Sequence, residues 1–370
     1  MKLSYWKRYD RVYKNFSAKK IYNKILDFAK KLGKPFEKKS NRGRNFSIEP
    51  EEYVAYSVFK ISSGDHLRDM ELDTESFFKK HLDHSTFGKN LKKIPCEYLR
   101  KLLQLTGKYL EKLLGHTKVH IPDSTKLSAD RYKEIIYRGE PRLVKETFKL
   151  HTLVQRHPKK KMTIIMDGLS SDAHISDAEG AVRMSHVLQE GDILPADRGY
   201  DYEKVYEACA EKKVITNIKK QDRQDGKGFR YRKKAKFRTQ SYKKQRGVVE
   251  TRFGTIENAG LTLTHYRNED TRFKYGLILL MKQNIDNLLR LEVEKLIILV
   301  NCSTNSMVSV SSIILLHSAS SVLTPPSLCK ISMTHSGTLA LYFPRLLNNL
   351  LADELLFLKV KPPLLSDFSD

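Results

Sequence analysis

Hydrophobic residues in the first third of the chain recur every three to five positions, the spacing that places side chains on one helix face. The pattern runs from Trp6 to Ile25, ends at Gly33 and returns several times before residue 116. A polar, basic loop at Lys34–Phe46 interrupts it. The spacing predicts helices over residues 1–33, Glu51–Ile61 and Cys96–Leu114. After a break at Ser62–Asp65 it predicts another helical stretch to about Lys80. We therefore expect an N-terminal all-helical domain at residues 1–116.

The pattern changes at Lys118, where short alternating or apolar runs typical of strands begin. The first three such runs follow one another, and the later ones alternate with helical segments. That order predicts an α/β domain over residues 117–292, with a mixed sheet flanked by helices. Strands are expected at Lys118–Pro122, Phe148–Val154, Met162–Met166, Ile193–Leu194 and Val214–Ile218, and helices at Ala178–Gln189, Tyr202–Lys212, Lys243–Asn258 and Arg272–Leu291.

Residues 293–370 read as a different kind of sequence. They are rich in Ser and Leu, and their apolar runs have no clear period. From residue 301 onward the segment holds equal numbers of basic and acidic residues, so the first 300 residues carry the whole formal net charge of +24. Such a shift is what translation in another frame or past an ancestral stop gives, and we expect an atypical, poorly ordered tail. A genuine C-terminal helical module is the alternative.

The charge of the whole chain indicates a polyanionic partner. There are 67 Lys and Arg residues against 43 Asp and Glu, and the pI is about 9.7, which favours nucleic acid. The four Cys residues are scattered without metal-ligand spacing, so a disulfide framework or zinc site is not expected and a reducing cytoplasm is. The N-terminus lacks the apolar core of a signal peptide. Polar residues interrupt the most hydrophobic stretch, Leu296–Leu316, so no membrane span is expected.

Two acidic residues follow strand-like runs. Asp123 stands in His-Ile-Pro-Asp-Ser-Thr and Asp197 in Ile-Leu-Pro-Ala-Asp-Arg-Gly-Tyr. A residue at the carboxyl end of a strand can project into a crevice and hold a cation there. The alternatives are that Asp123 caps the next turn and that Asp197 belongs to a structural strand-to-helix turn. Arg198 and Asp201 are expected to pair at the surface.

A third acid, Glu250, stands on a predicted helix. Tyr242, Arg246 and Glu250 are spaced four residues apart, which stacks their side chains on one helix face. An ordinary surface ion pair between Arg246 and Glu250 is the simpler alternative. Acids from three separate elements that converge can hold a pair of divalent cations and support displacement at phosphorus. The combination of Asp123, Asp197 and Glu250 therefore carries the chemical hypothesis.

Other polar residues have simpler interpretations. Asp167 and Asp172 flank Gly168 and two Ser residues, so we expect both acids to serve a turn. His174 and His186 have no Cys or acid at ligand spacing and are expected at the surface. The basic stretches 34–46 and 219–246, which include Arg42 and Arg44, are expected to contact DNA phosphates. Solvated loops are the alternative there.

Taken together, these motifs resemble the DDE transposases of prokaryotic insertion sequences, in particular the group whose third motif is Y-x2-R-x3-E-x6-K. The resemblance spans roughly residues 50–292 and rests on Asp-Ser-Thr, Asp-Arg-Gly-Tyr-Asp and Tyr-x3-Arg-x3-Glu, with Asp83-His-Ser-Thr-Phe upstream. The chain departs from the group in two places. Tyr242 is one residue farther from Arg246, and Glu257 stands where the group has Lys.

The resemblance implies a ribonuclease-H-like catalytic domain in which Asp123, Asp197 and Glu250 bind two Mg²⁺ ions, with Mn²⁺ as a substitute. It also implies that Tyr242 and Arg246 position DNA phosphates, with Lys243, Lys244 or Arg252 supplying further charge. The expected reaction is metal-dependent cleavage at element ends, followed by strand transfer into target DNA. The expected partners are double-stranded DNA and a second subunit, in a prokaryotic cytoplasm at the nucleoid. A metal-dependent endonuclease without strand transfer, and an inactive DNA-binding remnant, are the alternatives.

Overall fold

The computed structural model describes Lys7 and residues 18–38, 45–157, 162–222, 228–245, 263–266 and 268–317. Within these ranges the side chains of Asp130, Leu263 and residues 295–317 are not described. The chain divides into two compact units, residues 1–301 and 302–370. The fold below is that of the first unit, from which only helix α12 continues into the second.

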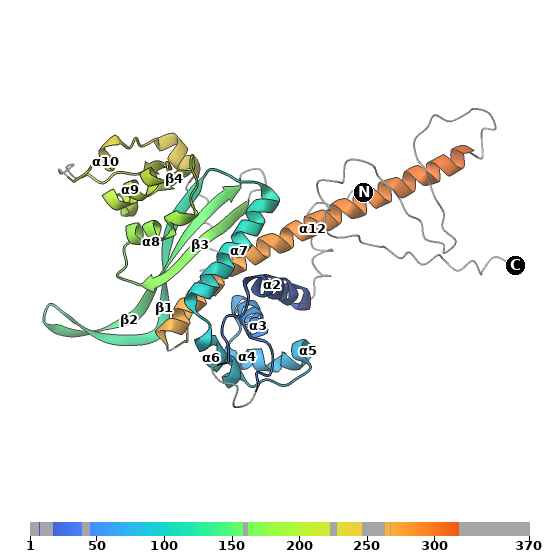
Figure 1. Ribbon diagram of the computed structural model, residues 1–370, viewed down its shortest axis with the longest axis horizontal. Helices are drawn as coiled ribbons and strands as arrows, with labels where there is room; N and C mark the ends of the chain where they lie inside the picture. The colour runs from blue at the N-terminus through green and yellow to red at the C-terminus, as the bar shows by residue number, and fades with distance from the viewer. Residues whose placement is uncertain are drawn as a thin grey trace. The chain divides into compact units, whose positions relative to one another are not determined.

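Every described element before residue 115 is a helix (Figure 1). The helix predicted at Cys96–Leu114 is confirmed to the residue, because its apolar positions form one broad stripe and Gly115 follows it with a positive φ of 86°. The segment before Lys80, predicted as one helical stretch, forms two short helices instead. The helices are α2 (Ala18–Leu32), α3 (Pro50–Ser62), α4 (Leu67–Leu72), α5 (Thr74–Phe78), α6 (His84–Lys93) and α7 (Cys96–Leu114).

Three antiparallel strands follow, β1 (His120–Tyr137), β2 (Glu140–His157) and β3 (Met162–Asp172), with β2 in the middle. A parallel pair, β4 (Ile193–Ala196) and β5 (Ile215–Ile218), lies beside the start of β1, where Val119 and Ile193 form a parallel bridge. Further along the same edge, β1 pairs with β6 (Leu263–Thr264). The structure thus has a four-stranded sheet in the order β3-β2-β1-β6 and a two-stranded parallel sheet of β4 and β5, which a single bridge between Val119 and Ile193 connects to the start of β1.

Both hairpin strands are much longer than the apolar pattern predicted. Each has 18 residues, because the pairing continues beyond the region where one face is buried and alternation of apolar residues can be seen. As a consequence Asp123 lies inside β1, opposite Thr152 of β2. The expectation that a strand ends at Asp123 is wrong.

Helices cover both faces of the sheet. Between the strands lie α8 (Asp177–Met184) with the short helix η1 (Ser185–Val187), then the short helix η2 (Arg198–Tyr200), α9 (Glu203–Glu211) and α10 (Tyr231–Lys234). Helices α8 and α9 share a small core with β4 and β5. On the other face, α7 and α12 (Glu269–His317) join the N-terminal helices and the three-stranded sheet in one large core.

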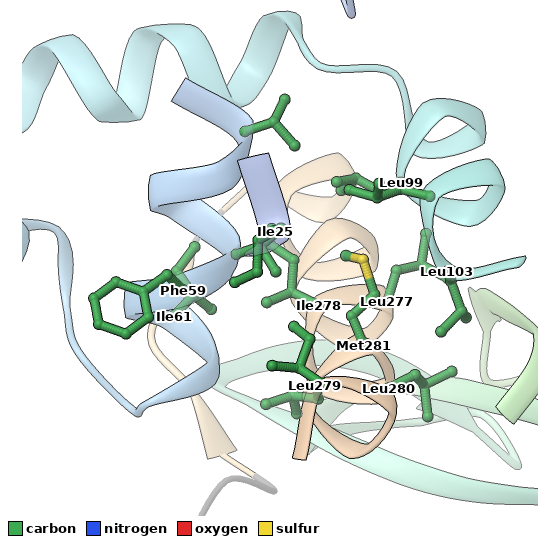
Figure 2. Packing of buried hydrophobic residues seen from close by; sticks show 14 of the residues in the cluster. Ile25, Phe59, Ile61, Leu99, Leu103, Leu277, Ile278, Leu279, Leu280 and Met281 are labelled. Carbon is green, nitrogen blue, oxygen red and sulfur yellow. The ribbon is translucent and has the colours of Figure 1, made fainter. Parts of the chain in front are cut away.

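Figure 2 shows the centre of this large core, where Leu277 to Met281 of α12 lie between Ile25 and Phe59 on one side and Leu99 and Leu103 on the other. Helix α7 approaches β3 closely at Gly107. A Cβ atom there would lie 2.6 Å from the carbonyl oxygen of Ile165, so any larger residue would push the helix from the sheet. Asn284 of α12 bonds the backbone N–H and carbonyl of Ile165, at 2.9 and 2.8 Å.

Helix α12 is longer than predicted. The apolar period indicated a helix over Arg272–Leu291, whereas α12 extends from Glu269 to His317, into the segment interpreted as an atypical tail. Residues beyond 317 lie outside the described residues. Among the helices that the structure describes, none is long and apolar enough to cross a membrane.

Candidate active site

Asp123, within β1, and Asp197, directly after β4, each stand four residues beyond the bridge that connects these two strands. The bridge between Val119 and Ile193 sets the register, and the N–H of Ile193 donates to the carbonyl of Lys118 at 2.6 Å. Four residues further along each strand direction stand Asp123 and Asp197. Adjacent strands are about 4.8 Å apart where they are bridged, so from this register we expect the first two predicted acids near the carboxyl end of β4.

Each of the two carboxylates also fixes its local backbone. Asp123 accepts a hydrogen bond from the N–H of Ser124 at 2.9 Å, and Asp197 accepts one from the N–H of Gly199 at 2.9 Å. Asp197 thereby caps the short helix η2 that follows β4. Both residues are only half-buried. The alternative that Asp123 caps a turn is therefore wrong, because β1 continues beyond it. The alternative of a structural turn accounts for one oxygen of Asp197, which caps η2.

A third carboxylate, that of Asp177, joins these two strands, and the sequence did not reveal it. Ser124 donates its hydroxyl to Asp177 Oδ1 at 2.5 Å. A Cβ atom built on Gly199 would lie 3.0 Å from Asp177 Oδ2 and 3.2 Å from Asp197 Oδ1. Asp177 therefore lies between the Asp-Ser-Thr segment of β1 and the Asp-Arg-Gly turn after β4. In the sequence it resembles an ordinary acid in the first turn of a helix capped by Ser176.

The surroundings of Asp177 keep it charged. Burial alone would raise its pKa, but hydrogen bonds from Lys149 and Ser124 outweigh burial and lower it. Lys149 Nζ lies 2.8 Å from Asp177 Oδ1. On the same strand as Lys149, His151 is fully buried, and its desolvation lowers the pKa of the ring to about 4. At neutral pH the group is therefore an ionised Asp177 held by a cation, beside an uncharged imidazole.

Gly180 of α8 allows this arrangement. A Cβ atom at that position would lie 2.4 Å from Nδ1 of His151, so only glycine lets α8 approach β2 so closely. The helix N-terminus, with Asp177, is thereby held against the strand that carries Lys149.

The predicted surface pair of Arg198 and Asp201 is wrong. Asp201 is completely buried and forms two hydrogen bonds of 2.8 Å with Arg232, whose side chain is 3% exposed. Arg198 instead lies 4.0 Å from the exposed Asp222. Arg232 belongs to the basic stretch 219–246 that was expected to contact phosphates, so this cation is part of the core and is not available to DNA.

The turn predicted for Asp167 is also wrong. Asp167 lies within β3 and its side chain has no exposed surface. Its carboxylate pairs with Arg100 of α7 at 2.9 and 2.6 Å and accepts a hydrogen bond from Gln104. His186, expected to be a plain surface residue, lies 3.8 Å from the same carboxylate. Through these contacts the buried carboxylate of Asp167 attaches α7 to the sheet. The sequence around Asp167 resembled a turn because Gly168 and two Ser residues follow it.

Several predicted site residues can be placed only in part. Tyr242, Lys243 and Lys244 lie on a helical segment at 239–245. The carbonyl of Lys244 accepts a hydrogen bond from Arg156 near the end of β2, and the side chains of Lys243 and Lys244 are exposed. The remaining predicted residues lie outside the described residues: Glu250, Arg246, Arg252, Arg42 and Arg44.

A second group of ligand-type atoms lies in the helical region. Donor atoms of Glu71, Asp83 and His84 are within 4.8 Å of one another. Hydrogen bonds account for this group, since Asp83 caps α6 through the N–H of Ser85 and Glu71 accepts from both the backbone and the ring of His84. The Asp-His-Ser-Thr-Phe motif is therefore the start of helix α6.

Comparison with known proteins gives the class of domain that this geometry fits. The family model described as "Transposase DDE domain" matches residues 115–285, a segment that holds Asp123, Asp197 and Glu250. This match supports a DDE transposase. Among solved structures, the chain is similar to the piggyBac transposase in a synaptic complex with hairpin DNA, at 10% identity and a TM-score of 0.35, over 74% of this chain and 77% of that one. No curated protein sequence matches the chain.

Proposed function

We propose that this protein is a transposase that cleaves DNA at the ends of an insertion sequence and transfers the cut strand into target DNA. The observation that carries the proposal is that Asp123 in β1 and Asp197 directly after β4 each follow the bridge between these parallel strands by four residues, inside the segment similar to a transposase DDE domain. We also propose that the element is prokaryotic, that the protein belongs to the group with the Y-R-E-K motif, and that it acts in the cytoplasm at the nucleoid.

The strand order supports a ribonuclease-H-like catalytic domain. The antiparallel strands β1, β2 and β3 and the parallel pair β4 and β5 meet at the bridge between Val119 and Ile193, where the start of β1 lies beside the start of β4 and the two run parallel. The end of a strand at such an edge is where ligands bind in open α/β sheets. We further propose residues 1–116 as the DNA-binding domain and residues 117–292 as the catalytic domain.

The donor set fits a hard divalent cation. Asp123 and Asp197 offer carboxylate oxygens at one place, Asp177 adds a third nearby, and the described neighbours include no thiolate, which favours Mg²⁺ or Mn²⁺ over zinc. We propose that Asp123, Asp197 and Glu250 hold two such ions. When bound, these ions would supply an activated hydroxyl and neutralise the charge on the leaving oxygen.

The other proposed site residues orient the metal-binding acids or neutralise negative charge. Asp177 orients Ser124, next to Asp123, and touches the turn that carries Asp197, while Lys149 balances its charge. Tyr242, Lys243 and Lys244, together with Arg246, Arg252, Arg42 and Arg44, are proposed to contact DNA phosphates. A net charge of +24 would hold the duplex with an affinity that falls steeply with salt.

Labelled duplex carrying the DNA that flanks this gene tests the function directly. With Mg²⁺ or Mn²⁺ we expect cut ends and, when a target plasmid is added, covalently joined products; with EDTA we expect neither. Cutting without joined products would favour the metal-dependent endonuclease. Salt-sensitive binding without any cutting would favour the DNA-binding remnant, and inspection of the gene near codon 300 for a frame disruption would then explain the tail.

Replacing Asp177 by Asn is expected to lower the cleavage rate about 10- to 100-fold, the usual cost of losing a group that orients metal ligands. The substitution removes the negative charge beside Lys149 while keeping the shape of the side chain. It should also raise the Mn²⁺ concentration that gives half-maximal thermal stabilisation of the protein. Glu179→Gln, on the same helix, is the matched control and should leave both measurements unchanged. If Asp177→Asn and the wild type required the same Mn²⁺ concentration for stabilisation, Asp177 would have no role at the metal site.

A further inference from the structure

The hairpin of β1 and β2 continues beyond the sheet as a two-stranded arm, residues 130–146 (Figure 1). The pairing of β1 with β6 ends at Ala129, and the register of β1 against β2 shifts between Ser128 and Tyr132. This irregularity lies where the arm leaves the body of the molecule. A bulge at such a point increases strand twist and redirects the hairpin. Nothing in the site described above uses the arm.

The cross-strand pairs define two faces of the arm, because paired residues in an antiparallel ladder lie on the same side. One face, here called the apolar face, holds the pairs Tyr132 with Lys145, Glu134 with Leu143, and Ile136 with Pro141. The opposite face holds the pairs Lys133 with Val144, Ile135 with Arg142, and Tyr137 with Glu140. The two faces therefore differ in chemistry.

Large hydrophobic side chains are strongly exposed on the apolar face. Tyr132 is 61% exposed, Ile136 81% and Leu143 74%. Three such residues on one side of a hairpin form a contiguous apolar surface, which on a soluble protein marks a site of interaction. The opposite face exposes less apolar surface, since Ile135 and Val144 are half-buried and its exposed aromatic, Tyr137 at 45%, has Arg142 over its ring at 5.0 Å. The apolar face is thus the one that lacks a partner among the described residues.

We propose that the apolar face of the arm binds the same face of a second copy of this chain. The charges support a self-complementary contact, because the face carries one acid, Glu134, and one base, Lys145, and no net charge. In a two-fold contact each copy presents the same patch to the other, so apolar side chains meet apolar ones and each charged group can meet its opposite.

Charge argues against DNA as the occupant of this face. Residues 131–145 include five basic and two acidic residues, but Lys145 is the one base whose pair lies on the apolar face. Lys133 and Arg142 lie on the opposite face, and Arg138 lies at the turn. Phosphates are bound by cations, so DNA would be expected on the opposite face while the apolar face stays available for the second subunit.

This contact would form the dimer interface of the proposed transposase. Only the biological purpose of the contact rests on the proposed function. It does not depend on the acids or on metal. A stable interface buries roughly 800 Å² on each partner, and a hairpin face of this size alone is smaller. We therefore expect association in the micromolar range, measurable by sedimentation equilibrium of the full chain without DNA.

The double substitution Ile136→Asp and Leu143→Asp tests the contact. It should raise the dimer dissociation constant at least tenfold, as expected for residues at the centre of an interface, with an unchanged circular dichroism spectrum. Leu72→Asp is the matched control, because Leu72 is equally exposed, at 80%, on helix α4. A monomeric wild type up to about 100 μM, or equal dissociation constants for the wild type and the double variant, would overturn the proposal.

A charge swap separates the contact from general damage to the arm. Glu134→Lys alone should weaken the dimer, and Glu134→Lys combined with Lys145→Glu should restore it. If the aspartate double variant lost affinity for DNA while its self-association stayed the same, the face would belong to DNA and the proposal would be wrong. Asp197→Asn should leave self-association unchanged, so failure of the catalytic proposal remains distinguishable from failure of this one.

Discussion

Replacing Asp197 by Asn is expected to lower the rate of metal-dependent DNA cleavage by more than about 100-fold, because even an outer partner of a metal ligand is usually worth 10- to 100-fold. Asparagine can still accept the 2.9 Å hydrogen bond from the N–H of Gly199. The turn after β4 should therefore keep its shape, and the loss should come from the missing charge at the metal site. Cleavage of labelled end DNA at saturating Mn²⁺ measures the effect.

The control for this experiment is Asp222→Asn. The side chain of Asp222 is 94% exposed and lies 4.0 Å from Arg198, the residue after Asp197. Its removal changes the net charge by the same amount and should leave cleavage within about twofold of the wild type, as is usual for surface substitutions. The same low background of cutting for the wild type and Asp197→Asn would show that the activity does not come from these acids.

The helices were the part of the fold that the sequence predicted best. Helix α7 agrees at both ends, because its buried residues recur every three to four positions and Pro95 and Gly115 mark its limits. The hairpin strands were predicted at less than half their length. Neither face of the arm, residues 130–146, is packed against a core. Apolar and polar residues therefore need not alternate along its strands, and Glu134 and Ile136 lie on the same face.

Local motifs suggested two residues of the proposed site, whereas contacts that depend on tertiary packing could not be found from the sequence. Asp123 and Asp197 were proposed from their positions after apolar runs, and each follows the bridge between Val119 and Ile193 by four residues, although Asp123 lies within β1 and not at its end. Asp177 could not be found in this way, since its role arises from contacts with Ser124 and Lys149, 53 and 28 residues away in the sequence. Asp167 shows the opposite error, because its turn-like neighbours concealed a buried partner on α7.

Replacing Arg232 by Ala is expected to destabilise the protein by about 3–5 kcal/mol, the cost of leaving one member of a buried ion pair without its partner. Asp201 would keep its charge in a fully buried position after losing two hydrogen bonds of 2.8 Å. Lysine at position 232 should restore only part of the stability, because it cannot donate two parallel bonds from a planar group. Urea denaturation measures the free energy of unfolding. Lys233→Ala, one residue on and exposed, should change it by less than about 0.5 kcal/mol.

The same pair predicts how stability depends on pH. Burial alone would raise the pKa of Asp201, but hydrogen bonds from Arg232, Gln221 and Tyr206 outweigh burial and lower it. A carboxyl whose pKa is lower in the folded protein than in the unfolded chain adds stability above the unfolded value of about 3.9. That contribution is lost as the pH falls toward the folded value. The difference in unfolding free energy between the wild type and Arg232→Ala should therefore be largest near pH 7 and shrink below about pH 4. A difference that stayed constant with pH would mean that packing of the Arg232 side chain, and not its charge, stabilises this part of the domain.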